Sequence, residues 1–400
     1  MQENWQKKTA IFLGSQAISL FGSSLVQYAI LWYITLETKS GTMMMISIVF
    51  GFVPTFFLAP FAGVWADRYN RKLLIALSDS MIALSTLLLA ILFWLGHDYI
   101  WLLFLMSAVR AIGGGIQTPA VGAFLPQIVP KDKLFRINGI NSSIQAVINL
   151  LSPMLAGAVL SIASIEAIFL IDVFTATIAV LSLIFLLKVP PHAKAMQKQT
   201  LSYFADLKAG LSYIMNHGYL KNFFIFCAFF FFLIAPGAFL TPLQVANCYG
   251  DEVWRLTAIE VAFSIGMMLG GVLISLWKGF KNKIHTMAFA TFIMGFSTFL
   301  LGLTPLFWIY LGIMFIYGIV IPIYHTPTTV LLQHQVEEEF HGRVFGVLSM
   351  ISSSTVPMSM LLFGPLADLV KVEWILLTSG SLLLVLSFFF VRNKSLLYHG

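Results

Sequence analysis

Gly63-Val64-Trp65-Ala66-Asp67-Arg68-Tyr69-Asn70-Arg71-Lys72 is a short charged stretch between two long apolar runs. Four of its last six residues are charged, and an apolar run of membrane-spanning length lies on each side. A loop that is so short and so charged leaves no room for a linker between domains. We therefore predict a tight cytoplasmic turn that joins two transmembrane helices.

The composition extends this interpretation to the whole chain. Of the 400 residues, 59% are hydrophobic and only 10% are charged, whereas ordinary soluble domains have about 25% charged residues. A soluble core could not cover so much apolar surface, so most of the chain must lie in lipid. The net charge of +6 does not indicate a nucleic-acid partner, because the basic residues fall in alternate loops.

The lengths of the apolar runs predict the number of membrane crossings. A helix needs about 20 apolar residues to cross a bilayer. With this measure the sequence predicts twelve spans, at residues 11–36, 42–66, 73–95, 99–124, 138–163, 165–187, 220–246, 255–278, 284–303, 306–332, 343–368 and 372–391. Of the 23 Lys and Arg residues, only Lys39, Arg255 and Lys371 fall in loops on the side opposite to the termini. The positive-inside rule then places both termini in the cytoplasm.

The longest polar stretch divides the twelve spans into two sets of six. We predict an N-terminal half over residues 1–187, a cytoplasmic linker over 188–219 and a C-terminal half over 220–400. Apolar residues from Leu201 to Ile214 recur at helical spacing in the linker. This pattern is compatible with an amphipathic helix along the inner membrane surface and also with a plain connector.

The two halves carry matching sequences, which indicates an internal repeat. Val, Arg and Gly recur in register before the fifth and the eleventh spans, as Val129, Arg136, Gly139 and Val336, Arg343, Gly346. Two related six-helix halves with a substrate site near the midplane between them are typical of secondary transporters.

The charged turn and the repeat together resemble the major facilitator superfamily of secondary transporters. The pattern Gly-x-x-Ala-Asp-Arg-x-x-Arg-Lys is similar to that family's signature between helices 2 and 3, with Trp65 and Asn70 as departures. Asn70 stands where Gly is usual, and we expect Asn to be tolerated because it accepts a left-handed backbone conformation. The resemblance implies an all-α membrane protein with twelve transmembrane helices in two six-helix halves.

The same resemblance implies a conformational latch at the inner side of the membrane. The Asp67 carboxylate would face the N-terminal end of the eleventh span near Arg343, where the helix dipole favours a negative charge. This contact would hold the two halves together. The residues expected to form the latch are Gly63, Asp67, Arg68, Arg71, Lys72 and Arg343.

Charged side chains inside the spans are functional candidates because they are expensive in lipid. Arg110 opens Arg-Ala-Ile-Gly-Gly-Gly, which is similar to the family's helix-4 signature, and it either tunes a proton-carrying acid or clamps two helices. Glu260 and Asp172 are our first and second choices for the proton carrier, and either could instead face a watery vestibule. Asp79 lies seven residues beyond Lys72, so we expect a structural salt bridge to the basic turn.

Aromatic and sulfur-containing side chains indicate a hydrophobic cargo. The chain contains 37 Phe and 17 Met, and a cavity lined with such residues suits large apolar molecules better than sugars. His325 could titrate in this cavity or bond to a neighbouring helix. The candidate lining residues are Gln16, Gln27, Tyr28, Trp32, Phe229, Tyr324 and His325.

Within the superfamily, the chain resembles the macrolide-efflux branch of drug:proton antiporters. The similar features run from Gly14-Ser-Gln16 in the first span to Gly342-Arg343 before the eleventh. The resemblance implies export of hydrophobic drugs such as macrolide antibiotics across the bacterial cytoplasmic membrane, driven by proton entry. The alternatives are export of an endogenous lipophilic metabolite or siderophore and a general multidrug pump. We expect a monomer without nucleic acid or cofactor, and assistance by an ATP-binding-cassette partner stays open.

Other classes of function are disfavoured. A membrane enzyme would need clustered nucleophile, base or metal-ligand residues at one depth, but the eight His are scattered and lie mostly in loops. The spacing of Cys227 and Cys248 is not that of a metal site. No P-loop sequence is present, so ATP does not drive the protein directly. We therefore expect neither an enzyme nor a metal site.

Overall fold

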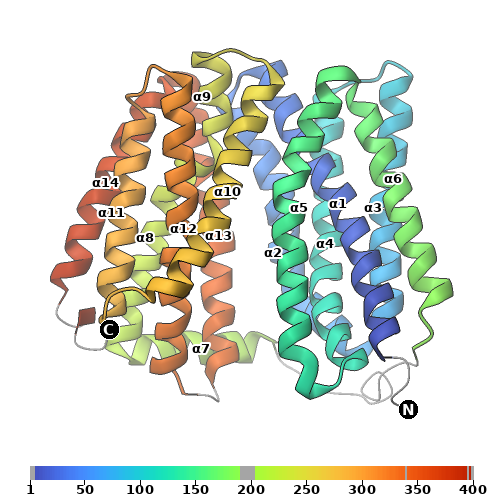
Figure 1. Ribbon diagram of the computed structural model, residues 1–400, viewed down its shortest axis with the longest axis horizontal. Coiled ribbons are helices and arrows are strands. Elements are labelled where there is room, and N and C mark those ends of the chain that lie inside the picture. The colour runs from blue at the N-terminus through green and yellow to red at the C-terminus, as the bar shows by residue number, and fades with distance from the viewer. Residues whose placement is uncertain (1–4, 190–202, 338–339, 394–395, 398–400) are drawn as a thin grey trace. The chain divides into compact units, whose positions relative to one another are not determined.

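The computed structural model is helical and describes residues 5–189, 203–337, 340–393 and 396–397 (Figure 1). Side chains are described for these residues except 59, 60, 63, 64, 67, 131, 135, 203–207 and 342. Within this part of the chain, twelve helical segments are long and apolar enough to cross a membrane. The predicted all-α fold with twelve spans is therefore confirmed.

The chain forms two compact units, of which the first comprises residues 1–34 and 46–201. Within this unit, α3 packs along both α4 and α6 (Figure 1). A 3-10 turn, η1 (Lys131–Lys133), precedes α5, and a π-helical turn, η2 (Ser182–Leu186), extends α6. The helices that contribute to the unit are α1 (Trp5–Thr38), α2 (Gly41–Arg68), α3 (Arg71–Trp94), α4 (Ile100–Ile128), α5 (Leu134–Ile162) and α6 (Ile165–Leu181).

The second unit comprises residues 35–45 and 202–400, so it includes the connection between α1 and α2. Its α8 and α9 together form one span, and α10 packs along α12 while α11 packs along α14. The helices of this unit are α7 (Tyr203–Asn216), α8 (Gly218–Phe239), α9 (Thr241–Cys248), α10 (Val253–Trp277), α11 (Lys283–Leu301), α12 (Phe307–Gln335), α13 (His341–Leu369) and α14 (Val372–Arg392).

The short helix α7 runs crosswise to the long helices of the second unit (Figure 1). Ile214 is 4% exposed and belongs to the core of this unit, and Gly210 lies against the backbone of Arg343 in α13. These contacts fix the C-terminal part of α7 to protein. The linker residues 190–202, including Leu201, lie outside the described residues, and the position of α7 on a membrane surface stays a prediction.

Asparagine residues begin two corresponding helices, one in each unit. The Asn70 side chain accepts a hydrogen bond from Lys72 N at 3.1 Å, and Asn282 accepts one from Ile284 N at 2.8 Å. Asn70 has φ −62° and ψ 110°, so its backbone is extended and not left-handed as we expected. Asn is present here because its side-chain oxygen satisfies an amide that the first turn of a helix leaves unpaired.

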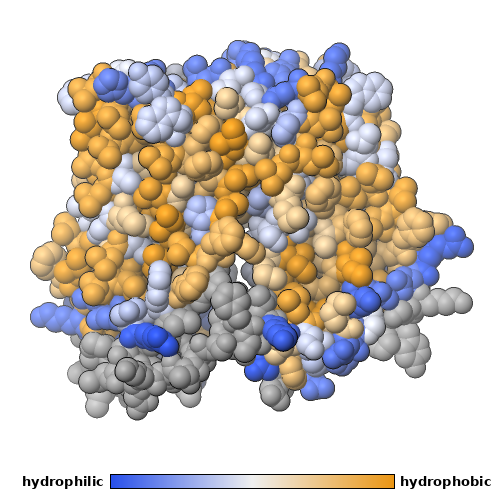
Figure 2. Space-filling view, turned by 180° about the vertical axis from the view of Figure 1, so that it is seen from behind, coloured by the Kyte–Doolittle hydropathy of each residue, from blue (hydrophilic) through white to orange (hydrophobic). Residues whose placement is uncertain are grey.

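The outer faces of the helices are apolar. On α3, Leu77, Leu84 and Leu88 form an exposed stripe, whereas Asp79 and Thr86 are buried on another face. Figure 2 shows hydrophobic residues over the bodies of the helices and hydrophilic residues gathered toward their ends. This distribution suits helices that face lipid along their length and water at their ends.

Candidate functional site

Three helices of the first unit carry buried or half-buried polar residues seven positions apart. Seven residues are close to two helical turns, so such residues share a face and lie about 10 Å apart along the axis. The pairs are Gln16 and Ser23 on α1, Asp79 and Thr86 on α3, and Arg110 and Gln117 on α4. Packing of the three helices gathers these side chains into two polar layers, which this spacing could have predicted from the sequence.

The first layer, called here the ion-pair layer, consists of Arg110, Asp172, Thr86 and Ser23. Arg110 Nη1 lies 2.7 Å from Asp172 Oδ2 and donates to Thr86 Oγ1 at 3.0 Å, while Arg110 Nη2 donates to Ser23 O at 2.8 Å. Thr86 Oγ1 donates to Asp172 Oδ2 at 3.1 Å, and Ser23 Oγ donates to Asp172 Oδ1 at 3.4 Å. Four helices, α1, α3, α4 and α6, therefore meet at one carboxylate.

The ion-pair layer is almost closed to its surroundings. The Asp172 side chain is 0% exposed and that of Arg110 is 11% exposed. Gly22 allows the close approach of α1 and α6, because a Cβ there would lie 2.0 Å from Thr175 Oγ1. A buried ion pair is expensive to desolvate, and removal of one partner leaves an uncompensated charge. The layer is thus a strong tie between helices as long as both charges are present.

The second layer, called here the amide layer, consists of Asp79, Ser19, Gln16 and Gln117. Asp79 is 2% exposed, and its Oδ1 accepts hydrogen bonds from Gln117 Nε2 at 2.6 Å and from Ser19 Oγ at 3.1 Å. Gln117 Nε2 also lies 3.5 Å from Gln16 Oε1. A carboxyl group is therefore buried among neutral side chains, and two of these side chains are amides.

The predicted salt bridge between Asp79 and the basic turn is wrong. Lys72 Nζ donates to the carbonyl oxygens of Ile184 and Leu187 at 3.0 and 2.8 Å, and Asp79 bonds to α1 and α4 instead. The physical reason is distance, because Asp79 lies two turns farther along α3 than Lys72.

The basic residues of the turn bond within the first unit. Arg71 Nε donates to Ala66 O and Arg71 Nη1 to Ala123 O, each at 2.9 Å. Cations at these carbonyls stabilise the C-terminal ends of helices. The side chain of Asp67 and residues 63 and 342 lie outside the described side chains, Arg68 is exposed, and Arg343 lies over the Phe340 ring. The latch between halves stays a prediction.

A second charged cluster lies in the second unit where α2 begins. Asp368 of α13 accepts hydrogen bonds from the Gly41 and Thr42 amides, at 2.6 and 3.0 Å, and from Ser40 Oγ at 3.0 Å. Nearby in sequence, Lys39 Nζ lies 3.0 Å from Asp251 Oδ2. A carboxylate is well placed at a helix N-terminus. Asp368 therefore fixes the connection between α1 and α2 to α13, a contact that we did not predict.

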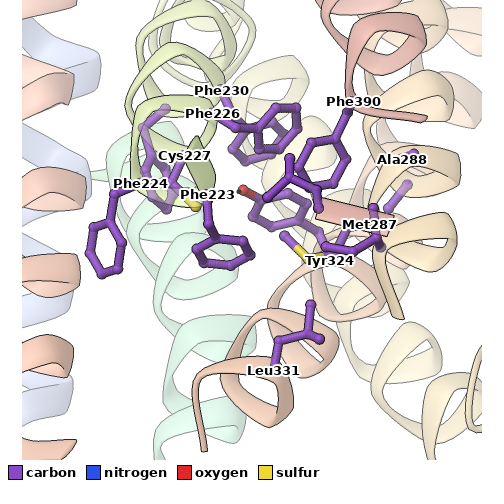
Figure 3. Packing of buried hydrophobic residues seen from close by; sticks show 14 of the residues in the cluster. Phe223, Phe224, Phe226, Cys227, Phe230, Met287, Ala288, Tyr324, Leu331 and Phe390 are labelled. Carbon is purple, nitrogen blue, oxygen red and sulfur yellow. Dashed lines mark hydrogen bonds between the residues drawn. The ribbon is translucent and has the colours of Figure 1, made fainter. Parts of the chain in front are cut away.

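The predicted site residues of the second unit lie in different surroundings. Glu260 on α10 is half-buried and makes no hydrogen bond or ion pair with the described residues. Phe229 is 57% exposed and His325 is exposed. Tyr324 is 0% exposed, and its ring stacks on Phe230 in the core shown in Figure 3. Tyr324 thus belongs to the buried core of the second unit, and its role in a substrate cavity stays a prediction.

The predicted cavity residues of the first unit lie along α1. Tyr28 and Trp32 form an aromatic pair with ring centroids 5.6 Å apart, Trp32 is 0% exposed, and Gln27 is exposed. Gln16 belongs to the amide layer. Ala17, the next residue, lines an open cavity of about 580 Å³, whose other walls come from α5 and include Arg136, Ile140, Ser143, Ile144, Val147 and Ile148.

The family model for the Major Facilitator Superfamily matches residues 12–359, and the chain belongs to this superfamily. Macrolide efflux protein A of Streptococcus pyogenes is 28% identical over 386 residues, which cover 96% of this chain and 95% of that protein. Macrolide efflux protein A of Enterococcus faecalis is 27% identical over 323 residues, which cover 80% of this chain and 100% of that protein. The staphyloferrin A transporter of Staphylococcus aureus is 23% identical, with 96% of each chain covered.

Solved structures show the same fold. A mutant form of the nucleoside transporter NupG superposes with a TM-score of 0.72 at 14% identity and covers 97% of this chain and 99% of its own. A POT family transporter superposes with a TM-score of 0.74 at 13% identity, with 96% of each chain covered. The protein is thus a multi-pass membrane transporter of the major facilitator fold and not an enzyme.

Proposed function

We propose that the protein is a proton-coupled secondary transporter that exports hydrophobic drugs, macrolide antibiotics first among them. It works by alternating access in a bacterial cytoplasmic membrane, with both termini in the cytoplasm. The full-length similarity to macrolide efflux proteins from two bacterial genera supports this cargo. The excess of basic residues in the loops on the side of the termini supports the orientation.

The observation that carries the proposal is the pair of polar layers inside the first unit. Ionisable groups within membrane spans are rare and mark ion or proton pathways. Here a buried Arg110–Asp172 ion pair lies two helical turns from a second buried acid, Asp79. A carboxyl group at such a depth can take up a proton when the site opens to one side and release it when the site opens to the other.

The open cavity between α1 and α5 supports a hydrophobic cargo. Its volume of about 580 Å³ is in the range of small-molecule sites. Isoleucine and valine side chains dominate its α5 wall, and Ser143 and Arg136 supply the few polar groups. We take this cavity, with Gln27 and Tyr28 farther along α1, as the part of the substrate site that the first unit contributes.

The test is uptake of radiolabelled erythromycin into everted membrane vesicles with an imposed inward-acid pH gradient. We expect uptake that collapses when a protonophore is added. Asp172→Asn should reduce uptake to the level left by the protonophore, because Arg110 loses its counter-charge. The matched control is Asp132→Asn, which alters an exposed acid of the same unit and should transport normally. An absence of erythromycin uptake in vesicles that contain folded protein would overturn the macrolide assignment.

The same vesicles test the role of Glu260. This half-buried acid on α10 lacks a partner among the described residues, so it is free to bind a proton or to face water. Loss of gradient-driven uptake in Glu260→Gln would assign Glu260 to the proton pathway. Normal uptake would exclude Glu260 from that pathway.

Export of a lipophilic metabolite or siderophore, or general multidrug efflux, is the second candidate. It is supported by the similarity to a staphyloferrin A transporter and to the multidrug efflux pump Tap of Mycolicibacterium fortuitum, which is 24% identical over 367 residues. Vesicles that fail with erythromycin but accumulate an iron-free siderophore or a lipophilic dye under the same gradient would favour this candidate.

A further inference from the structure

Two buried polar atoms in the amide layer lack a hydrogen-bond partner among the described residues. They are Asp79 Oδ2 and Gln16 Nε2. The other oxygen of Asp79 accepts two hydrogen bonds, from Gln117 and Ser19, so the carboxyl group is satisfied on one side only. A buried polar atom without a partner costs free energy, and two complementary ones in a single layer call for a common explanation.

The charge balance of the two layers differs. Arg110 of α4 and Asp172 of α6 are the charged side chains that the packed helices bring near Asp79, and they neutralise each other at 2.7 Å. The side chains that donate hydrogen bonds to Asp79 are Ser19 on α1 and Gln117 on α4, and neither carries a charge. Among the described side chains, Asp79 therefore has no cation of its own, and a buried carboxyl group in this situation is accommodated as the neutral acid.

We infer that Asp79 is the proton-carrying acid of this transporter and that Gln16 is its switching hydrogen-bond partner. When Asp79 is neutral, the O–H on Oδ2 donates to Gln16 Oε1. When the proton leaves, rotation of the Gln16 amide turns its Nε2–H toward the ionised Oδ2. One proton moves between water and a carboxylate oxygen, and no other bond forms or breaks.

Gln16 is next to a cavity-lining residue in the sequence of α1. Its neighbour Ala17 lines the open cavity between α1 and α5, while Asp79 is 2% exposed. Asp172 then has a different role from Asp79, because it is tied to Arg110, Thr86 and Ser23 and clamps four helices. The inference rests on the proposed proton coupling and assigns that coupling to one residue.

The first test needs no substrate. Infrared difference spectra between alkaline and acidic buffer are recorded on the full-length protein in lipid nanodiscs, where a protonated buried carboxyl gives a separate C=O band. We expect a titrating band in the native protein, its loss in Asp79→Asn and its persistence in Asp172→Asn and in the exposed-site control Asp132→Asn. Asp79→Glu, which keeps a carboxyl group, should retain a titrating band at a shifted frequency.

Gln16→Met tests whether the hydrogen bond from Gln16, and not only the burial of Asp79, sets the titration of the Asp79 carboxyl group. It keeps the size of the side chain and removes both hydrogen-bonding groups, so it should displace the titration midpoint of the band without abolishing the band. A native band that survives Asp79→Asn, a band that disappears only in Asp172→Asn, or the lack of any titrating band would overturn the inference.

Transport assays distinguish failure of this inference from failure of the proposed function. Asp79→Asn should lose gradient-driven accumulation and keep exchange of labelled for unlabelled substrate across the vesicle membrane, because exchange needs no net proton movement. Native erythromycin uptake without an Asp79 band would refute the inference alone. An Asp79 band without erythromycin uptake would refute the macrolide cargo alone.

Discussion

The two units hold their helices together by different means. In the first unit, four helices meet at the Arg110–Asp172 ion pair, and a second buried acid lies two turns away. The corresponding interior of the second unit is aromatic (Figure 3). There, Phe226 stacks on Phe390 with ring centroids 3.6 Å apart, and Phe230 stacks on Tyr324 at 3.8 Å.

Glycine adds close helix packing to the second unit. A Cβ at Gly318 would lie 2.1 Å from Phe263 O, and one at Gly270 would lie 2.1 Å from Ile319 O, so α10 and α12 touch backbone to backbone. Gly295 and Gly380 allow the same approach of α11 and α14. The hydrophobic effect does not drive helices to associate in lipid, so close packing and hydrogen bonds between helices must stabilise their association. The first unit relies more on polar bonds, which respond to protons, and the second on packing, which does not.

The largest expected effect is the loss of one charge from the ion-pair layer. Asp172→Ala leaves Arg110 buried and unpaired and should destabilise the protein by about 3–5 kcal/mol. The measurement is the unfolding midpoint of the purified protein in detergent, given as the SDS mole fraction or the temperature at which half of the protein is unfolded.

A double variant checks the cause. Arg110→Met combined with Asp172→Leu removes both charges and should recover most of the stability, because no charge remains unpaired. If the double variant were as unstable as Asp172→Ala, the unpaired charge of Arg110 would not be the cause of the lost stability. The contrast between a polar first unit and a packed second unit would then not explain their stability.

The second effect concerns the glycine contacts of the second unit. Gly318→Ala forces a methyl group against the Phe263 carbonyl and should cost about 1–3 kcal/mol through separation of α10 and α12. Gly312→Ala on the same helix is the matched control, because no atom lies within 4 Å of a Cβ there. It should leave the midpoint unchanged or raise it slightly. Equal losses in the two variants would show that helix packing in this unit does not depend on Gly318.

The third effect compares one buried hydroxyl in each unit. Thr86→Val removes a group that bonds both Arg110 and Asp172, and it should cost about 1–3 kcal/mol because two charged groups lose a partner. Tyr324→Phe removes a hydroxyl that lies 3.7 Å from Cys227 Sγ, and it should cost at most about 0.5 kcal/mol. Both residues are 0% exposed, so burial is matched. A larger loss for Tyr324→Phe would reverse the comparison between the units.

The sequence predicted the fold well because the bilayer imposes a length on each span. Apolar runs and the charged turn after Gly63 were sufficient to predict the twelve spans found in the described part of the chain. Arg110 and Asp172 were also identifiable, since any charge within a span is conspicuous. Their pairing was not predictable, because they are 62 residues apart and only the packing of α4 and α6 brings them together.

The remaining parts of the site depend on which face of a helix turns inward. A helix that is apolar all round gives no such signal, so Tyr324 could be interpreted as a cavity residue although it lies in a core. Asp79 was assigned to the basic turn of Arg68, Arg71 and Lys72, whereas its partners come from α1 and α4. The seven-residue spacing of polar residues on three helices is the pattern that would have corrected this error.

The smallest expected effect concerns the exposed ion pair of the second unit, between Lys39 and Asp251. The hydrogen bond from Lys39 lowers the pKa of Asp251 in the folded protein. The pair therefore contributes its full stability above the unfolded-state pKa of about 3.9, and this contribution is lost as the pH falls through the lower pKa of the folded state. Water and salt screen such a pair. Asp251→Asn should therefore change the unfolding midpoint slightly at neutral pH, not at all in acid, and not at all in high salt. Asp172→Ala should destabilise the protein equally in low and high salt, because its charges are buried. If Asp251→Asn were as harmful as Asp172→Ala, burial would not be what distinguishes the two pairs.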